Sequence, residues 1–136
     1  MALIAVLEFG DNSIKRYSKQ YLVSDCRLVF DRPYNAFSPE RAPRCERMEV
    51  TVIAPGKSDL SLFQWYSQQE INDGRIAISL VGDGKIEADP QVIYFENGQC
   101  LSLSEVYDID NSHRRLLKLA IIAEKIELEN VEFKCL

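Results

Sequence analysis

The stretch that decides the fold is Asp59-Leu60-Ser61-Leu62-Phe63-Gln64-Trp65-Tyr66-Ser67-Gln68-Gln69-Glu70. It is the one segment whose pattern does not indicate a β-strand, and it holds the only tryptophan of the chain. At about 100° per residue, four large side chains fall within one arc of a helical wheel, with polar residues over much of the opposite side. The four are Leu62, Phe63, Trp65 and Tyr66. The pattern predicts one short α-helix, over residues 59–70, whose aromatic stripe packs on a core built by the rest of the chain.

Local signals bound this helix at both ends. Pro55-Gly56 breaks the chain before it, and Ser58 or Asp59 can accept hydrogen bonds from its first amide groups. Asn72-Asp73-Gly74 offers residues that commonly end a helix. We therefore expect the helix to be confined to this stretch.

Strand-like alternation accounts for most of the remaining sequence. In residues 47–54, alternate positions carry Met48, Val50 and Val52, which we expect to face inward. The same reasoning predicts inward-facing side chains in two further strands: Ile76, Ile78 and Leu80, and Leu22, Cys26, Leu28 and Phe30. The predicted strands cover residues 2–9, 21–30, 47–54, 75–81, 91–95, 99–107, 116–123 and 125–129, with a further run after a change of parity at Asn130.

The turns and the strand count indicate the architecture. Asn-Gly is a favoured two-residue turn, so Asn97-Gly98 predicts a hairpin between residues 91–95 and 99–107. Residues 2–9 are apolar on nearly both faces, as in a sheet that is covered on each side. About eight antiparallel strands and one helix predict a mainly β fold, a closed barrel or sandwich with the helix packed on it. A length of 136 residues suits one domain, spanning residues 1–136.

Residues 31–46 interrupt the alternation. The segment has three prolines and no periodicity, which predicts a long extended loop. Tyr34 and Phe37 give it aromatic side chains, so we expect either a binding role or an ordered arm. A plain surface loop is the alternative.

Composition and charge argue against two classes of partner. The net charge is −5 and the basic residues are dispersed among acids, whereas a nucleic-acid site requires clustered lysine and arginine. No apolar run approaches the ~20 residues that would span a bilayer. The first residues are apolar but lack the basic region of a signal peptide, so we expect folding in the cytoplasm.

Patterns typical of catalysis or metal binding are not found. His113 is the only histidine, and neither a nucleophile nor an orienting acid stands at a defined spacing from it. The cysteines are far apart and form no Cys-x-x-Cys pair, so we expect reduced thiols. They are Cys26, Cys45, Cys100 and Cys135. We therefore expect no enzyme activity, no bound metal and no cofactor.

Four short motifs follow one another along the chain. Asp31-Arg32-Pro33 opens the extended loop, and Leu62-Phe63-Gln64-Trp65-Tyr66 forms the centre of the predicted helix. Asn72-Asp73-Gly74-Arg75-Ile76 leads into a strand, and Ala120-Ile121-Ile122-Ala123-Glu124-Lys125-Ile126 lies in the closing strands. In order and spacing these motifs resemble the Hcp (haemolysin co-regulated protein) family of type VI secretion inner-tube proteins, in the form found in Bacteroidetes. Asp31 stands where the family has a glycine, and Tyr66 where it has a methionine.

The resemblance implies a structural protein that forms a homohexameric ring. Rings would stack into a tube within a sheath and be expelled with the spike and effector proteins, which makes the protein cytoplasmic first and then secreted without a signal peptide. The resemblance also places the extended loop between stacked rings. The contact residues expected there are Arg32, Tyr34, Phe37, Glu40, Arg41 and Arg44.

Three alternative functions stay open. A phage tail-tube protein shares this architecture, and neighbouring genes would distinguish it. A monomeric small-ligand barrel needs an open apolar pocket, which the helix stripe is expected to plug. A barrel for single-stranded nucleic acid needs aromatic residues interleaved with lysine and arginine, whereas the aromatics here stand beside acids.

Overall fold

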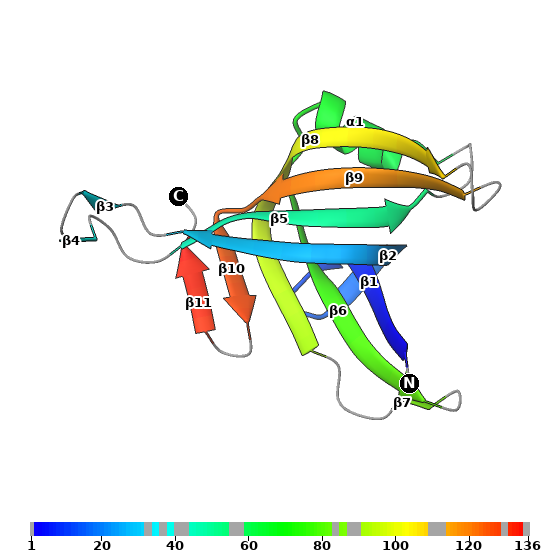
Figure 1. Cartoon of the computed structure of the whole chain (residues 1–136), viewed down its shortest axis with the longest axis horizontal. Coiled ribbons are helices and arrows are strands. Elements are labelled where there is room, and N and C mark those ends of the chain that lie inside the picture. The colour runs from blue at the N-terminus through cyan, green and yellow to red at the C-terminus, as the bar shows by residue number, and fades with distance from the viewer. Residues whose placement is uncertain are drawn as a thin grey trace.

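The computed structural model describes residues 2–31, 34–35, 38–39, 44–54, 59–82, 85–86, 91–108, 114–128 and 131–134. The described elements are eleven strands and one helix (Figure 1). In chain order they are β1 (Ala2–Asp11), β2 (Arg16–Asp31), β3 (Tyr34–Asn35), β4 (Ser38–Pro39), β5 (Arg44–Ile53), α1 (Ser61–Ser67), β6 (Asn72–Gly82), β7 (Lys85–Ile86), β8 (Gln91–Asp108), β9 (Arg114–Ile122), β10 (Lys125–Leu128) and β11 (Val131–Lys134).

Antiparallel pairings close the main sheet into a barrel. β8 pairs with β9, and the order then continues through β5, β2, β1 and β6, which pairs again with β8. β10 and β11 extend from the β8 side, and β7 extends from β6. The prediction of a closed β-barrel with one packed helix is therefore confirmed.

Two long strands make the corners of the barrel. β2 pairs with β1 through its first half and with β5 through its second half. β8 likewise pairs with β6 and β10 up to Gly98 and with β9 from Gln99 onward. The register shifts between Val23 and Asp25 in β2 and between Cys100 and Ser102 in β8. Such bulges add twist, which lets one strand pass from one wall of a barrel to the next.

The bend in β8 corrects the predicted hairpin at Asn97-Gly98. Both residues lie inside one strand, where Asn97 has a φ of 53°. Hydrogen bonds from distant segments hold the bend: the Asn97 amide donates to Asp73 Oδ1 at 2.8 Å, and Trp65 Nε1 donates to the Gly98 carbonyl at 3.2 Å. An Asn-Gly pair supplies the same backbone freedom to a turn or to a bend, and here tertiary partners select the bend.

The inward positions of most strands agree with the alternation. Met48, Val50 and Val52 are 0–1% exposed, and Ile76 is fully buried. Within the described residues the buried core holds no polar or charged side chain. Its members are Leu7, Phe9, Tyr21, Met48, Val50, Val52, Leu62, Trp65, Ile76, Ile93, Phe95, Leu117, Leu119, Ile121, Ala123 and Ile126.

Two predicted inward positions in β2 are wrong. Leu22 is 55% exposed and Phe30 is 43% exposed, whereas Tyr21 is buried. The shift after Val23 changes which alternate residues face the core, and a second shift follows Val29. The alternating pattern of a single strand does not reveal a β-bulge. The pattern therefore predicted that the same set of alternate residues faces the core along the whole strand. The other two predicted positions, Cys26 and Leu28, pack against the core.

The helix is shorter than predicted, and its stop lies elsewhere. Asp59 Oδ1 accepts a hydrogen bond from the Ser61 amide at 3.0 Å, as expected for a residue near the N-terminus. At the other end Gln69 has a φ of 54°, its amide donates to the Tyr66 carbonyl, and the Glu70 amide donates to the Trp65 carbonyl. This is the left-handed closure that commonly ends a helix. The predicted stop at residues 72–74 is therefore wrong, because these residues begin β6.

Strand boundaries near two other predictions also differ. β5 begins at Arg44 rather than at residue 47, and its pairing with β2 extends to Asp31 opposite Arg44. Within the predicted loop, β3 and β4 pair with each other in a separate two-stranded sheet. The parity change at Asn130 corresponds to two strands, since β11 returns antiparallel to β10 with Val131 opposite Leu128.

In the described part of the chain, no helix combines the length and hydropathy that crossing a membrane would require.

Gly74 is a position where the fold requires the absence of a side chain. A Cβ atom there would lie 2.3 Å from the backbone oxygen of Glu8 and 2.8 Å from Cζ of Phe95. Gly74→Ala is therefore expected to lower the free energy of unfolding by about 1–3 kcal/mol through overpacking. Chemical denaturation can measure this, with Ser79→Ala on the same strand as the control. Equal stability of the two variants would contradict the close approach at Gly74.

Candidate functional site

Most of the predicted ring-contact residues lie outside the described residues. These are Arg32, Phe37, Glu40 and Arg41. Tyr34 lies in β3, and Arg44 is the first residue of β5. Figure 1 places the β3–β4 pair beyond the end of β2, away from the barrel. The contact role of all six residues stays a prediction.

The predicted helix stripe is only partly buried. Leu62 and Trp65 are 2% and 1% exposed, and Phe63 packs against the core from a half-buried position. Tyr66 is 46% exposed, so its predicted place in the core is wrong. Leu62 and Trp65 are the two residues that the helix buries, three positions apart on one face. Tyr66 lies at the edge of that face, about 40° from Leu62 around the helix axis.

The candidates for chemistry do not assemble into a site among the described residues. His113 and Cys135 lie outside them, and no group of three or more His, Cys, Asp or Glu residues in the described ranges could hold a metal ion. Cys26 and Cys100 are free and half-buried. Burial raises the pKa of each thiol to about 11, which disfavours the nucleophilic thiolate.

These two thiols should react slowly with alkylating reagents. A pKa of about 11, against an ordinary cysteine value of 9.0, lowers the thiolate fraction near neutral pH about 100-fold. Iodoacetamide labelling of the native protein, read site by site by mass spectrometry, should leave Cys26 and Cys100 largely unmodified. The same protein in denaturant should be labelled at both. Rapid labelling in the native state would contradict the burial.

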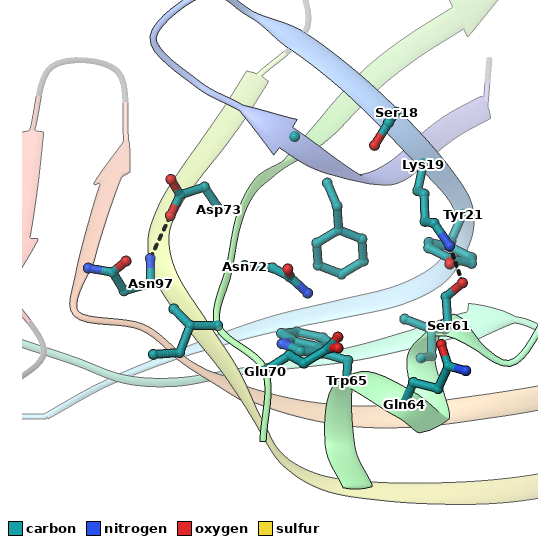
Figure 2. A pocket seen from close by; sticks show the side chains of 14 residues that line it. Ser18, Lys19, Tyr21, Ser61, Gln64, Trp65, Glu70, Asn72, Asp73 and Asn97 are labelled. Atoms are coloured by element: carbon teal, nitrogen blue, oxygen red, sulfur yellow. Dashed lines mark hydrogen bonds between the residues drawn. The ribbon is translucent and has the colours of Figure 1, made fainter. Parts of the chain in front are cut away.

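A polar pocket opens where α1 meets the barrel (Figure 2). We call it the α1 pocket; its volume is about 370 Å³. It is lined by Phe9, Gly10, Ser18, Lys19, Tyr21, Ser61, Leu62, Gln64, Trp65, Glu70, Ile71, Asn72, Asp73 and Asn97. Phe9 and Trp65 stack edge to face beneath it, with ring centroids 4.9 Å apart. The pocket thus has a rigid aromatic base and a wall contributed by β1, β2, α1, β6 and β8.

One end of the α1 pocket carries hydrogen-bond donors. Lys19 Nζ donates to Ser61 Oγ, which in turn lies beside the Tyr21 hydroxyl. The hydroxyl and amide of Ser61 hydrogen-bond to Asp59 and lower the pKa of its carboxyl group. The buried Tyr21 oxygen makes no hydrogen bond of ordinary geometry with the described residues. Tyr21 is 4% exposed, and burial raises the pKa of its hydroxyl.

The other end of the pocket is acidic. Asp73 uses Oδ1 to hold the bend of β8, as described above. The exposed side chain of Glu70 makes no hydrogen bond or ion pair with any other described residue, although its backbone amide closes the helix. Figure 2 shows Lys19 and Asp73 at opposite sides of the pocket. The charged lining residues are one lysine and two acids, which give the pocket a net charge of −1.

A second, shallower hollow lies on the outer wall formed by β2, β5, β8 and β9. Arg27 and Glu49 line this hollow and pair at 3.6 Å, and Arg47 pairs with the same Glu49 carboxylate at 3.1 Å. Such exposed ion pairs are ordinary features of a strand surface and indicate no chemistry.

The sequence reasoning missed the α1 pocket. Its polar residues come from β2, α1, the segment that follows α1, the start of β6 and β8, so no spacing pattern links them. No motif in the sequence links Lys19 with Glu70, which the predicted helix includes as its last residue. A pocket formed between elements requires the three-dimensional arrangement.

The chain resembles several solved structures over nearly its full length. Hcp1 from Flavobacterium johnsoniae superposes with a TM-score of 0.74 at 19% identity, covering 96% of this chain and 98% of that one. Hcp1 from E. coli EAEC 042 gives a TM-score of 0.75 at 12% identity, covering 99% of this chain and 100% of that one. Secreted protein Hcp3 from Pseudomonas aeruginosa gives 0.66 at 10% identity, covering 92% and 88%. At these identities the likeness establishes the fold. No match is found among curated protein sequences.

The match to a family profile supports a more specific conclusion than the structural similarity does. The profile described as Hemolysin coregulated protein Hcp (TssD) matches residues 1–135. It covers all four motifs that suggested the family, from the extended loop to the closing strands. The chain therefore belongs to the Hcp (TssD) family.

Proposed function

We propose that the protein is a structural subunit of the type VI secretion inner tube. Six copies form a ring, rings stack into a tube, and the tube is expelled together with spike and effector proteins. The observation that carries this proposal is the family profile over residues 1–135. The sheath, spike and effectors of the apparatus are the partners, and nucleic acid and membrane are not.

The packing of the barrel supports a structural role over a small-ligand barrel. Trp65, Phe95 and Met48 are each no more than 1% exposed and fill the interior beneath α1. A ligand barrel needs an open apolar cavity, whereas these large side chains belong to the packed core of the described residues. A phage tail-tube protein would have the same packing, so genomic context must distinguish that alternative.

Exposed apolar side chains on β1 and β2 support self-association. Ile4 and Leu22 are 43% and 55% exposed on the neighbouring strands β1 and β2. Exposed apolar side chains that gather on one wall commonly mark a protein interface. A closed ring uses heterologous contacts, in which one patch of each subunit meets a different patch of the next.

Within this proposal, residues 1–136 act as one domain whose extended loop, residues 31–46, reaches toward the adjacent ring. Tyr34 and Phe37 are aromatic anchors of the kind that dominate interfaces, and Arg32, Arg41 and Arg44 pair with acids there. Glu40 adds a partner of opposite charge. The protein folds in the cytoplasm, needs no cofactor or metal, and has no catalytic turnover.

Electron microscopy and an export assay test this function together. The purified protein at high concentration is expected to form rings and stacked tubes. In cells with an active type VI apparatus, it is expected in the culture medium, and deleting the sheath gene should abolish its export. A protein that forms no rings and stays in cells with an active apparatus would contradict the proposal.

A further inference from the structure

We propose that the α1 pocket is the receptor for the extended loop of a second copy, occupied by residues 32–44 of a subunit in the adjacent ring. This rests on the proposed function and goes beyond it, since it names the surface that the loop meets. The pocket combines a rigid aromatic base, an unpaired buried hydroxyl at Tyr21 and a free carboxylate at Glu70.

Charge complementarity identifies the occupant. Residues 32–44 hold three arginines and one glutamate, a net charge of +2. The whole chain carries −5, so removing this segment leaves −7 on the remainder. The pocket lining has a net charge of −1, opposite in sign to that of this segment, so the two attract each other.

The polarity along the pocket suits a peptide with neighbouring acidic and basic side chains. Lys19 and the Tyr21 hydroxyl can donate to a carbonyl or a carboxylate at one end. Glu70 and the second oxygen of Asp73 can accept from a guanidinium at the other end, where bidentate pairing is strong. The loop offers such a sequence at Glu40-Arg41.

The loop is also placed for a contact between subunits. β3 and β4 pair only with each other in the described structure, and Figure 1 places them away from the barrel. The three prolines of the segment restrict its unbound conformations, so that ordering it on a partner costs less entropy than ordering a flexible loop.

A charge reversal in the pocket is the direct test. Glu70→Lys should leave the ring mass and the melting temperature unchanged, because Glu70 is exposed and its side chain has no described partner. Tubes should nevertheless become much shorter under the electron microscope. The matched control is Asp25→Lys, which makes the same charge change at an exposed position of β2 and should leave tubes at the wild-type length.

A peptide of residues 32–44 provides a second measurement. Trp65 is the only tryptophan and lines the pocket, so its fluorescence should report binding of the peptide to the full-length protein. Binding should weaken with salt, and Glu70→Lys should weaken it about tenfold, as expected for losing one charge-assisted hydrogen bond. A peptide with glutamate at positions 32, 41 and 44 should not bind.

The outcomes separate this inference from the proposed function. If wild-type protein forms no rings or tubes, the proposed function fails. If wild-type tubes form and Glu70→Lys tubes have normal length, the pocket is not the receptor. Peptide binding that is unaffected by Glu70→Lys, or arginine amide binding as tightly as the peptide, would also overturn the inference.

Discussion

Replacing Trp65 with alanine is expected to lower the free energy of unfolding by about 3–5 kcal/mol, the usual cost of truncating a large buried aromatic side chain. Trp65 is 1% exposed and packs edge to face on Phe9. Its indole nitrogen also donates to the Gly98 carbonyl at the bend of β8, so truncation leaves that carbonyl without its partner. A domain of this size has a total stability of about 5–15 kcal/mol, and the variant should unfold or fail to accumulate.

Thermal melting of two neighbouring variants isolates the effect. Tyr66→Ala removes an aromatic ring that is 46% exposed and should melt within a few degrees of the wild type. Trp65→Phe keeps most of the ring packing but loses the hydrogen bond to Gly98, so its stability should be intermediate. If Trp65→Ala melts as close to the wild type as Tyr66→Ala does, the helix does not anchor the core.

Shortening the extended loop is expected to block tube growth while the barrel stays folded. Asp31 and Arg44 are paired residues of β2 and β5, so a two-residue Asn-Gly turn can replace residues 32–43 as a tight hairpin. In the described structure, the two short strands of the removed segment, β3 and β4, pair with each other in a separate sheet. Single rings should still form, but stacked tubes and export should be lost.

A variant whose loop has the wild-type length tests whether the loop acts through its side-chain contacts or only through its length. Replacing residues 34–43 with a glycine-serine sequence keeps the reach of the loop but removes Tyr34, Phe37, Glu40 and Arg41. This variant should also fail to stack, because flexible glycine-serine segments offer no anchors and cost more entropy to order. Normal tubes and normal export from the shortened variant would mean that residues 32–43 are only a surface loop.

The sequence predicted the burial of a side chain correctly where the adjacent residues of the same strand determine which way it faces. Regular alternation in β5 predicted the burial of Met48, Val50 and Val52, because every second residue of a strand faces one side. It failed for Leu22 and Phe30, where bulges in β2 change the face. It also failed at Asn97-Gly98, since the hydrogen bonds that select a bend come from Asp73 and Trp65, which lie far away in the sequence.

The candidate site was less predictable than the fold. The helix stripe identified Leu62 and Trp65, but the exposure of Tyr66 depends on how a seven-residue helix lies on the barrel. The α1 pocket joins Lys19, Ser61 and Glu70, which no sequence spacing relates. The family assignment came instead from short motifs along the whole length, which the profile over residues 1–135 confirms.

The native mass of the purified protein tests the central claim most directly. Light scattering at tens of micromolar should give a particle near six times the 15.6 kDa chain mass, and electron micrographs of the same sample should contain rings. A strictly monomeric mass at that concentration, together with micrographs without rings, would contradict the assignment of this chain as a tube subunit.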